Sequence, residues 1–425
     1  MFGKGALIMV MGAVIIFSLY QLKLNRSILS TTDNFNRQYT KTTLEAAAQS
    51  AMNYAINDVM NNGTTDRTYF IYSHNCTSQV KIEPFFSGEE VQATVVSNGW
   101  VVDEFDPDKM RRTQDSIVAM FSNSSSLSEY GWYSDNENGV FWITGDTCYG
   151  KMHSNKMIHT KGEPVFKKKV TSAQGINPSL KKTDAHFEGG YEKIPNQSIP
   201  TDMTKLQDLA ISGNGGAPMN TKSLYDKDLY LEFLADGQVV RTVSGVTDTM
   251  LVTDIAPDGA IWTTKDVHVK GILDGKISIL ANDDIWIDDD VLMKKDPKQY
   301  TDSDDALGLV AKDDIFVTNN TANQTDCNIQ AGLCAINGSF QAEDWSSRGP
   351  CGRLTVYGSI TQNVRGPVGN FQDLGWGGLI LKNGFKKSYY HDKRFDPSEE
   401  NVTHIMLPGY PTISGNGLKL VHWWE

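Results

Sequence analysis

The sequence predicts a mainly β protein with a long N-terminal α-helix, built as a small α+β roll followed by a β-solenoid (β-helix). Two observations support this fold class. An apolar run near the N-terminus continues into a helical pattern, and the first proline of the chain is Pro84. Farther along, short strand-like segments recur at intervals of roughly 18 to 30 residues, as solenoid coils do. The predicted boundaries are 1–60 for the helix, 61–127 for an antiparallel sheet, 128–374 for the solenoid with an insertion at about 173–250, and 375–425 for a C-terminal cap.

The first segment has the properties of a membrane anchor. Lys4 precedes an uncharged apolar run, Ala6–Tyr20, and extension to Leu24 gives the roughly 17 to 25 residues that span a bilayer. A cleavable secretory signal would end in a small-residue site, whereas Gln21–Arg26 follows here. We therefore expect a membrane helix that starts in the cytoplasm. A plain signal anchor and a helix that also assembles with other helices both remain open.

The helix is expected to continue beyond the anchor as an amphipathic helix. Apolar residues recur on one stripe of a 3.6-residue period. The stripe contains Leu44, Ala48, Ala51, Met52, Ala55, Ile56 and Val59. The stretch Ser27–Asn36 is rich in side chains that compete for backbone hydrogen bonds, so the helix is expected to be loosest there. Alternating strands at Glu90–Val96 and Gln114–Phe121 predict the sheet that covers the stripe.

The N-terminus resembles the PilX-type minor pilins of type IV pili and pseudopili. The resemblance rests on Lys4–Ile8, the long apolar run and Ala46–Ala51. It implies prepilin-peptidase cleavage between Gly5 and Ala6. It also implies assembly through the apolar helix; the assembly residues would be Leu7, Val10, Val14, Ile15 and Phe17. Most pilins carry a glutamate where this chain has Val10, and this difference is associated with atypical or tip subunits.

The solenoid prediction rests on internal repeats. Ala281–Ile287 (ANDDIWI) returns as Ala311–Val317 (AKDDIFV), and Thr264–Val269 is a weaker copy. A second pair, Asn337–Gln341 and Tyr357–Thr361, is also interpreted as a repeat. The positions expected to share the core are Val269, Ile287, Val317, Phe340 and Ile360. The resemblance extends to this region, as a β-helical extracellular domain of unassigned function behind PilX-like N-termini.

Clustered aspartates in the repeats raise the possibility of a calcium site. Asp283 and Asp284 fall in one repeat, Asp313 and Asp314 in the next, and calcium prefers several oxygen ligands. The competing interpretation is that each Asp caps a turn by accepting a backbone N–H. No other cofactor is expected. An unchanged melting temperature on addition of calcium would exclude the metal site.

The five cysteines predict disulfides. An exported chain with five cysteines is expected to form disulfides, with Cys327–Cys334 preferred, Cys334–Cys351 as the rival, and Cys76–Cys148 a further candidate.

Charge and missing motifs argue against nucleic-acid-binding proteins and enzymes. A net charge of -12 argues against a nucleic-acid partner. The motifs G-x-S-x-G, H-E-x-x-H, C-x-x-C-H and a phosphate loop are absent from the sequence, so no enzyme is expected.

The sequence hypothesis is therefore a non-enzymatic structural subunit of a type IV pilus-like filament. It would lie in the bacterial inner membrane before assembly and then at the extracellular surface, with copies of itself or other pilins as partners. The first alternative is a tip adhesin that binds a glycan or another cell. The second is a membrane-anchored polysaccharide lyase. A surface aromatic stripe would favour the adhesin, and an Asp cluster facing an arginine in a groove would favour the lyase.

Overall fold

The computed structural model describes residues 2–63, 65–73, 76–85, 90–102, 110–212, 227–373 and 379–424. As predicted, it is mainly β with one long N-terminal helix. The chain divides into two compact units. Unit 1 comprises residues 1–124 and 415–425, and unit 2 comprises residues 125–414.

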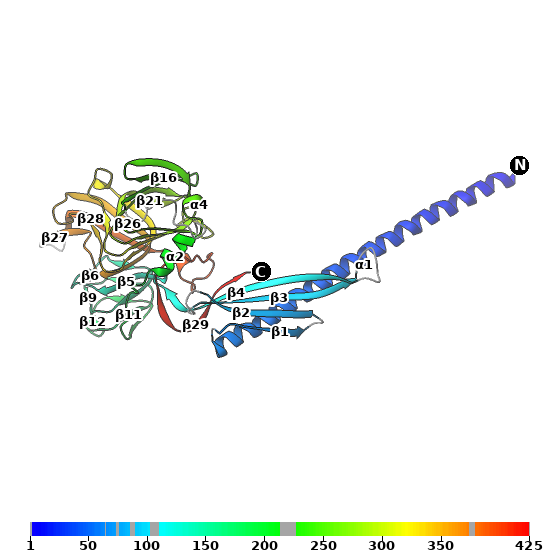
Figure 1. Cartoon of the computed structure of the whole chain (residues 1–425), viewed down its shortest axis with the longest axis horizontal. Helices are drawn as coiled ribbons and strands as arrows, with labels where there is room; N and C mark the ends of the chain where they lie inside the picture. The colour runs from blue at the N-terminus through cyan, green and yellow to red at the C-terminus, as the bar shows by residue number, and fades with distance from the viewer. Residues whose placement is uncertain are drawn as a thin grey trace. The chain divides into compact units, whose positions relative to one another are not determined.

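Unit 1 consists of the long helix and a five-stranded sheet (Figure 1). Helix α1 runs from Phe2 to Asn62, and the strands follow the spatial order β1-β2-β3-β4-β29. The first four strands pair antiparallel. The strand bounds are β1 (Arg67–Ser73), β2 (Cys76–Phe85), β3 (Glu90–Val102), β4 (Met110–Ser126) and β29 (Thr412–Trp424).

The sheet covers the predicted stripe of α1. Along the helix the buried residues are Leu44, Ala47, Ala48, Ala51, Met52, Ala55 and Val59. They pack on the alternate residues of β2, β3 and β4 that face inward, among them Val80, Ala93 and Phe121. Alanines dominate the helix side, which lets the helix axis approach the sheet closely.

Helix α1 is continuous where the sequence predicts loosening. The hydroxyl of Thr31 donates to the carbonyl oxygen of Ser27 at 2.8 Å, and that of Thr32 donates to Ile28 at 3.0 Å. These side chains satisfy their hydrogen bonds within the helix, so they do not compete with it.

The predicted C-terminal cap is wrong for its last strand. Strand β28 (Leu379–His391) and the 3-10 turn η3 (Lys393–Phe395) belong to unit 2. Strand β29 instead lies beside β4 at the edge of the unit 1 sheet. An unpaired edge on β4 would leave backbone donors and acceptors exposed, and β29 satisfies them.

Unit 2 contains a long ladder of parallel strands. Its spatial order is β18-β20-β22-β24-β26-β5-β8-β11-β14. One register column is apolar throughout: Ile261, Ile279, Leu309, Leu333, Ile360, Trp132, Met152 and Val170. The strand bounds are β5 (Tyr130–Asn136), β8 (Lys151–Ser154), β11 (Val170–Ser172), β14 (Tyr191–Lys193), β18 (Ala260–Thr263), β20 (Lys276–Ala281), β22 (Ala306–Ala311), β24 (Cys327–Ala335) and β26 (Pro350–Val364).

A second parallel ladder has the order β15-β19-β21-β23-β25. It confirms the first repeat, because Ile285 pairs with Ile315 and Ile287 with Val317. The second predicted repeat is wrong, since Phe340 pairs within this ladder and Ile360 within the other. The strand bounds are β15 (Leu229–Phe233), β19 (Val267–Leu273), β21 (Ile285–Met293), β23 (Ile315–Val317) and β25 (Phe340–Ala342).

The remaining strands before residue 193 form two small parallel sheets, with orders β12-β9-β6 and β13-β10-β7. Together with β14 of the long ladder, they show that parallel pairing continues to Lys193, so the insertion predicted from 173 begins later. The strand bounds are β6 (Phe141–Ile143), β7 (Thr147–Cys148), β9 (Ile158–Lys161), β10 (Val165–Phe166), β12 (Ile176–Asn177) and β13 (His186–Phe187).

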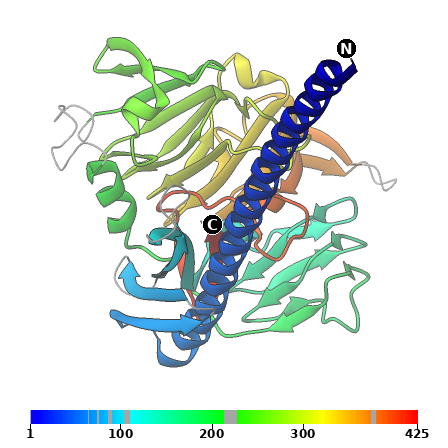
Figure 2. The ribbon, with the colours of Figure 1, turned by 90° about the vertical axis from the view of Figure 1, so that its right-hand side faces the viewer.

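The segment between the two strand groups forms covering elements. Helix α2 (Thr204–Ser212) and residues near Leu407 pack on the outward side chains of the long ladder, including Leu280 and Val310. A hairpin of β16 (Gln238–Val243) and β17 (Val246–Leu251) leads into the short helix α4 (Val252–Ile255). Figure 2 shows the later strands of unit 2, green to orange, as one group and the strands of 130–193, blue-green, as a second group beside it.

Candidate functional site

The two strand groups of unit 2 are joined differently on two sides. On one side β26 pairs with β5 through backbone hydrogen bonds, Ile360 opposite Trp132 and Thr361 opposite Tyr133. On another side β28 pairs with β26, and β7 ends its own three-stranded sheet. Strands β28 and β7 lie beside each other, yet no backbone pairing joins these two described strands. Side chains, among them the Lys387–Asp146 pair, connect the two strands instead.

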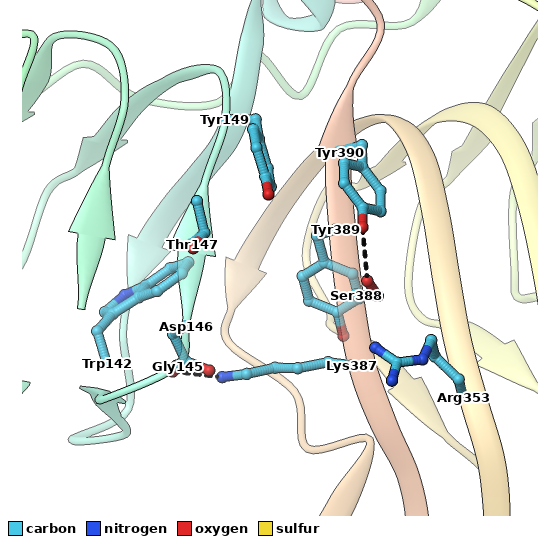
Figure 3. Close-up of a pocket in the computed structure, with 10 residues that line it drawn as sticks. All are labelled: Trp142, Gly145, Asp146, Thr147, Tyr149, Arg353, Lys387, Ser388, Tyr389 and Tyr390. Atoms are coloured by element: carbon cyan, nitrogen blue, oxygen red, sulfur yellow. Dashed lines mark hydrogen bonds and ion pairs between the residues drawn. The ribbon is translucent and has the colours of Figure 1, made fainter. Parts of the chain in front are cut away.

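A pocket of about 220 Å³ lies between these two strands, and we call it the junction pocket (Figure 3). Strands β28 and β26 supply one wall, and the β6–β7 segment supplies the other. The lining residues are Trp142, Gly145, Asp146, Thr147, Tyr149, Arg353, Lys387, Ser388, Tyr389 and Tyr390. The two walls come from segments more than two hundred residues apart in sequence, as the Asp146–Lys387 hydrogen bond shows with its separation of 241.

An ion pair crosses the junction pocket. The Nζ of Lys387 lies 2.9 Å from an oxygen of Asp146 and 5.4 Å from the ring centre of Trp142. Burial, together with the nearby Arg365, lowers the pKa of Lys387 despite the opposing effect of Asp146. The side chain of Lys387 as a whole is 24% exposed.

A buried charge network supports the wall behind the pocket. The side chains of Glu137 and Arg365 are 1% and 4% exposed, and their atoms Oε2 and Nη1 lie 2.7 Å apart. The indole N–H groups of Trp132 and Trp142 donate to the Glu137 carboxylate at 2.8 and 3.0 Å. Burial alone would raise the pKa of Glu137, but Arg365 and the hydrogen bonds from Ser134 and Trp132 outweigh it and lower the pKa. The guanidinium carbon of Arg365 lies 4.6 Å from the Trp142 ring centre, so the network fixes the orientation of that ring.

The rim of the pocket is aromatic. The rings of Tyr149 and Tyr390 stack with centroids 4.9 Å apart and planes 29° apart, and the two residues are 43% and 38% exposed. Tyr389 also lines the pocket (Figure 3). Burial raises the pKa of Tyr389, so its hydroxyl stays protonated and can donate.

Arg353 carries the free cation of the pocket. Its backbone N–H donates to Asp326, but no partner for its guanidinium is found among the described residues. Strand register places Arg353 opposite Lys386 on β28, and both residues are exposed. The open part of the pocket is therefore positively charged within a chain of net charge -12.

The second depression lies on the outside of the β15-β19-β21-β23 ladder. It has a volume of about 450 Å³ and is lined by Tyr230, His268, Lys270, Asp288, Asp289, Asn320, Thr321 and Ala322. Beside it, Tyr230, His268, Trp286 and Phe316 form a stack, with centroid spacings of 4.2, 5.9 and 4.6 Å. Within this stack each ring packs on the next, which stabilises the ladder.

The predicted calcium residues lie on successive turns. Asp283 and Asp284 come within 4.8 Å of Asp266, whereas Asp313 and Asp314 belong to the next turn. Each turn aspartate accepts a backbone N–H from the following turn: Asp266 from Asp284 at 3.0 Å, Asp284 from Asp314 at 2.8 Å, and Asp314 from Ser339 at 2.7 Å. This geometry fits the capping interpretation, and calcium binding stays a prediction.

The predicted Cys327–Cys334 disulfide is wrong. Cys148, Cys327, Cys334 and Cys351 are each free thiols, which also excludes the Cys334–Cys351 and Cys76–Cys148 pairings. Cys327 and Cys334 lie in the same extended strand β24 and pack in different core clusters, so their Cα atoms cannot approach within about 7 Å. Burial raises the pKa of both thiols and of Cys148.

The predicted processing and assembly residues all lie in α1. Gly5, Ala6 and Leu7 are in its first turns, where side chains fall outside the described set. Val10, Val14, Ile15 and Phe17 are 60%, 58%, 58% and 61% exposed. By length and composition α1 can span a membrane, with a mean hydropathy of 1.6 over its most apolar window.

Sequence reasoning missed the junction pocket entirely. Lys387 was interpreted within a terminal cap, and Asp146 lies in a turn beside an expected early coil. No local pattern indicates that β28 and β7 face each other. Comparison with protein-family models, curated proteins and solved structures finds no match for this chain.

Proposed function

We propose that this chain is a structural, non-enzymatic subunit of a type IV pilus-like or pseudopilus surface filament. The observation that carries the proposal is the exposed apolar surface of α1. It begins with Ile8 and includes Ile28, Leu29, Phe35 and Tyr39, which are 55%, 64%, 67% and 65% exposed. A surface of this kind on a water-exposed helix requires a partner.

The length of α1 separates a filament subunit from a simple anchor. A helix of 61 residues is about 90 Å long at 1.5 Å per residue, and a bilayer core is only about 30 Å thick. Burial against the unit 1 sheet starts at Leu44. The stretch between the bilayer and Leu44, which contains Phe35 and Tyr39, is therefore covered by neither. Packing against the same helix of other subunits would cover it.

Val10 affects how neighbouring α1 helices would be held in register. In most pilins a glutamate at this position pairs with a neighbouring subunit's amine, and a charged group in lipid is unfavourable unless paired. Val10 makes α1 easier to keep in the membrane and removes one contact that fixes register. This property supports an atypical or tip position in the filament.

We further propose that the parallel ladders of unit 2 are the coils of a β-solenoid displayed by the filament. Support comes from the register columns, in which equivalent residues of successive strands pair and the inward column stays apolar. Inner-membrane residence before assembly and an extracellular position afterwards follow from the proposed role.

A second candidate, a tip adhesin, is favoured by the junction pocket. The pocket combines an aromatic rim with the guanidinium of Arg353, which has no partner among the described residues. The two roles are compatible, because α1 would assemble the chain and unit 2 would bind.

Site-specific cross-linking tests the filament proposal. Phe35→Cys or Tyr39→Cys is introduced into the full chain in a bacterial host that assembles type IV pili, and the cells are treated with a mild oxidant. We expect disulfide-linked dimers with either variant, because these positions would face other α1 helices. Tyr72→Cys, on β1 and 78% exposed, is the matched control and should stay monomeric. Monomers at all three positions would support a plain membrane anchor instead.

A further inference from the structure

We propose that the junction pocket binds a carboxylate-bearing sugar residue of an acidic polysaccharide. The inference goes beyond filament assembly and does not depend on it, because every residue involved belongs to unit 2. It rests on the charge, the aromatic rim and the size of the pocket.

The charges of the pocket match one carboxylate. Lys387 is already paired with Asp146 at 2.9 Å, so its charge is largely balanced. Arg353 has no ionic partner within the described parts of the chain, and exposed Lys386 lies opposite it on the neighbouring strand. A guanidinium group binds a carboxylate through two parallel N–H···O bonds. Within the lining, Arg353 therefore supplies the positive charge for a carboxylate, and Asp146 disfavours a second negative charge.

Neutral polar groups also line the pocket. Among them is the hydroxyl of Tyr389, whose pKa is raised by burial. On the opposite wall Thr147 lies in β7, and no described strand pairs with the outer edge of β7, so backbone groups of that edge can bind hydroxyls. Such a mixture of one cation and several neutral polar groups suits a polyhydroxylated ligand.

The aromatic rim suits a sugar ring. Tyr149 and Tyr390 are both partly exposed at the mouth of the pocket, and one face of each remains outside their mutual stack. Sugar rings present C–H faces that pack on aromatic surfaces, whereas a free inorganic anion gains nothing from them. The volume of about 220 Å³ is below the usual 300 to 1,000 Å³ of drug-sized sites, which favours one residue of a chain over a large ligand.

The other depression does not share these properties. Its acids Asp288 and Asp289 disfavour an anion, and Asp288 is already bound by His268 at 3.0 Å and Thr318 at 2.7 Å. Tyr230 lies there, is 44% exposed, and provides a matched control for an exposed tyrosine elsewhere in unit 2.

Calorimetric titration of the full chain in detergent micelles tests the proposal. The probes are trigalacturonate, its neutral counterpart galactotriose, and acetate at the same concentration. We expect binding of trigalacturonate only. Arg353→Ala should weaken it about tenfold or more, the effect of losing a charge-assisted bidentate contact. Tyr390→Ala should also weaken binding, while Tyr390→Phe, which keeps the ring, and Tyr230→Ala should bind as the unaltered chain does.

Unchanged thermal unfolding of each variant shows that the fold is retained. If a variant unfolds early, Arg353→Lys replaces Arg353→Ala, because lysine keeps the charge but loses the bidentate geometry. Absence of binding to trigalacturonate overturns the proposal. Equal binding of galactotriose, equal binding of acetate, or an Arg353 variant of unchanged affinity overturns it as well.

Discussion

Asp284 is a turn-capping aspartate whose negative charge is disfavoured in the folded chain. Burial, followed by the carboxylates of Asp266 and Asp314, raises the pKa of Asp284 to about 6. An aspartate in an unfolded chain has a pKa of about 3.9. Between these values the folded chain keeps a proton that the unfolded chain has lost. The contribution of Asp284 to the free energy of unfolding therefore falls as the pH rises from about 4 to about 6.

Asp284→Asn should stabilise the protein at neutral pH. The amide keeps an oxygen that accepts the Asp314 N–H, bonded at 2.8 Å, and removes the charge that burial disfavours. We expect the melting temperature at pH 7.5 to rise by about 2 to 4 °C and to be unchanged near pH 4. Differential scanning calorimetry at both pH values measures the difference.

The control is Asp313→Asn, which removes the same charge from an exposed neighbour in the next repeat. It should change the melting temperature little at either pH. A lower melting temperature for Asp284→Asn at pH 7.5 would mean that the carboxylate is needed there, as a cation site would require.

Glu137 and Arg365 form the most buried ion pair described in unit 2 outside the Asp392–Arg394 pair. Glu137→Gln should reduce the free energy of unfolding by about 3 to 5 kcal/mol, because it leaves the Arg365 charge buried without its partner. Chemical denaturation measures the loss. The double variant Glu137→Gln, Arg365→Met should be more stable than the single one.

An exposed pair provides the comparison. Lys167 and Glu188 are 41% and 50% exposed, so Glu188→Gln should change the free energy of unfolding by only about 0 to 1 kcal/mol. Similar losses for Glu137→Gln and Glu188→Gln would show that the buried network does not hold the junction together.

At the scale of elements, the junction depends on two glycines that touch. A Cβ atom built on Gly150 of the β7–β8 turn would lie 2.6 Å from the Cα of Gly131 in β5 and 2.6 Å from Cγ of His391 in β28. Three segments of both strand groups thus meet at one point, which leaves no room for a side chain.

Gly150→Ala should therefore destabilise unit 2 by about 1 to 3 kcal/mol, the usual cost of overpacking. Thermal unfolding followed by circular dichroism measures it. Gly349→Ala is the matched control, because a Cβ atom there meets nothing within 4 Å. Equal stability of the two variants would contradict the close approach of β5, the β7–β8 turn and β28.

Periodicity predicted the elements whose partners are near in sequence. The stripe from Leu44 to Val59 and the paired repeats at Ile285 and Ile315 both follow from local patterns. Elements with distant partners escaped prediction. Strand β29 pairs with β4, and Lys387 contacts Asp146, although each pair is far apart in sequence. No periodic pattern in the sequence indicates such contacts.

At the scale of the whole molecule, chain order and spatial order differ within unit 2. In the chain, the strands of 130–193 come before those of 260–364. In the long ladder, β5 at the start of the first group pairs with β26 at the end of the second. A sequence read from one end predicts coils added in order, so it places the early strands at the start of the ladder. The junction pocket arises at the point where this order is broken.

Cryo-electron microscopy of filaments sheared from cells that express this chain, with mass spectrometry of its N-terminus, tests the filament role most directly. We expect the chain in the filaments, along their length or at one end, with α1 helices packed together in the centre and Ala6 as the first residue. Filaments that lack the chain, with the protein retained in the membrane fraction and its N-terminus uncut, would contradict it.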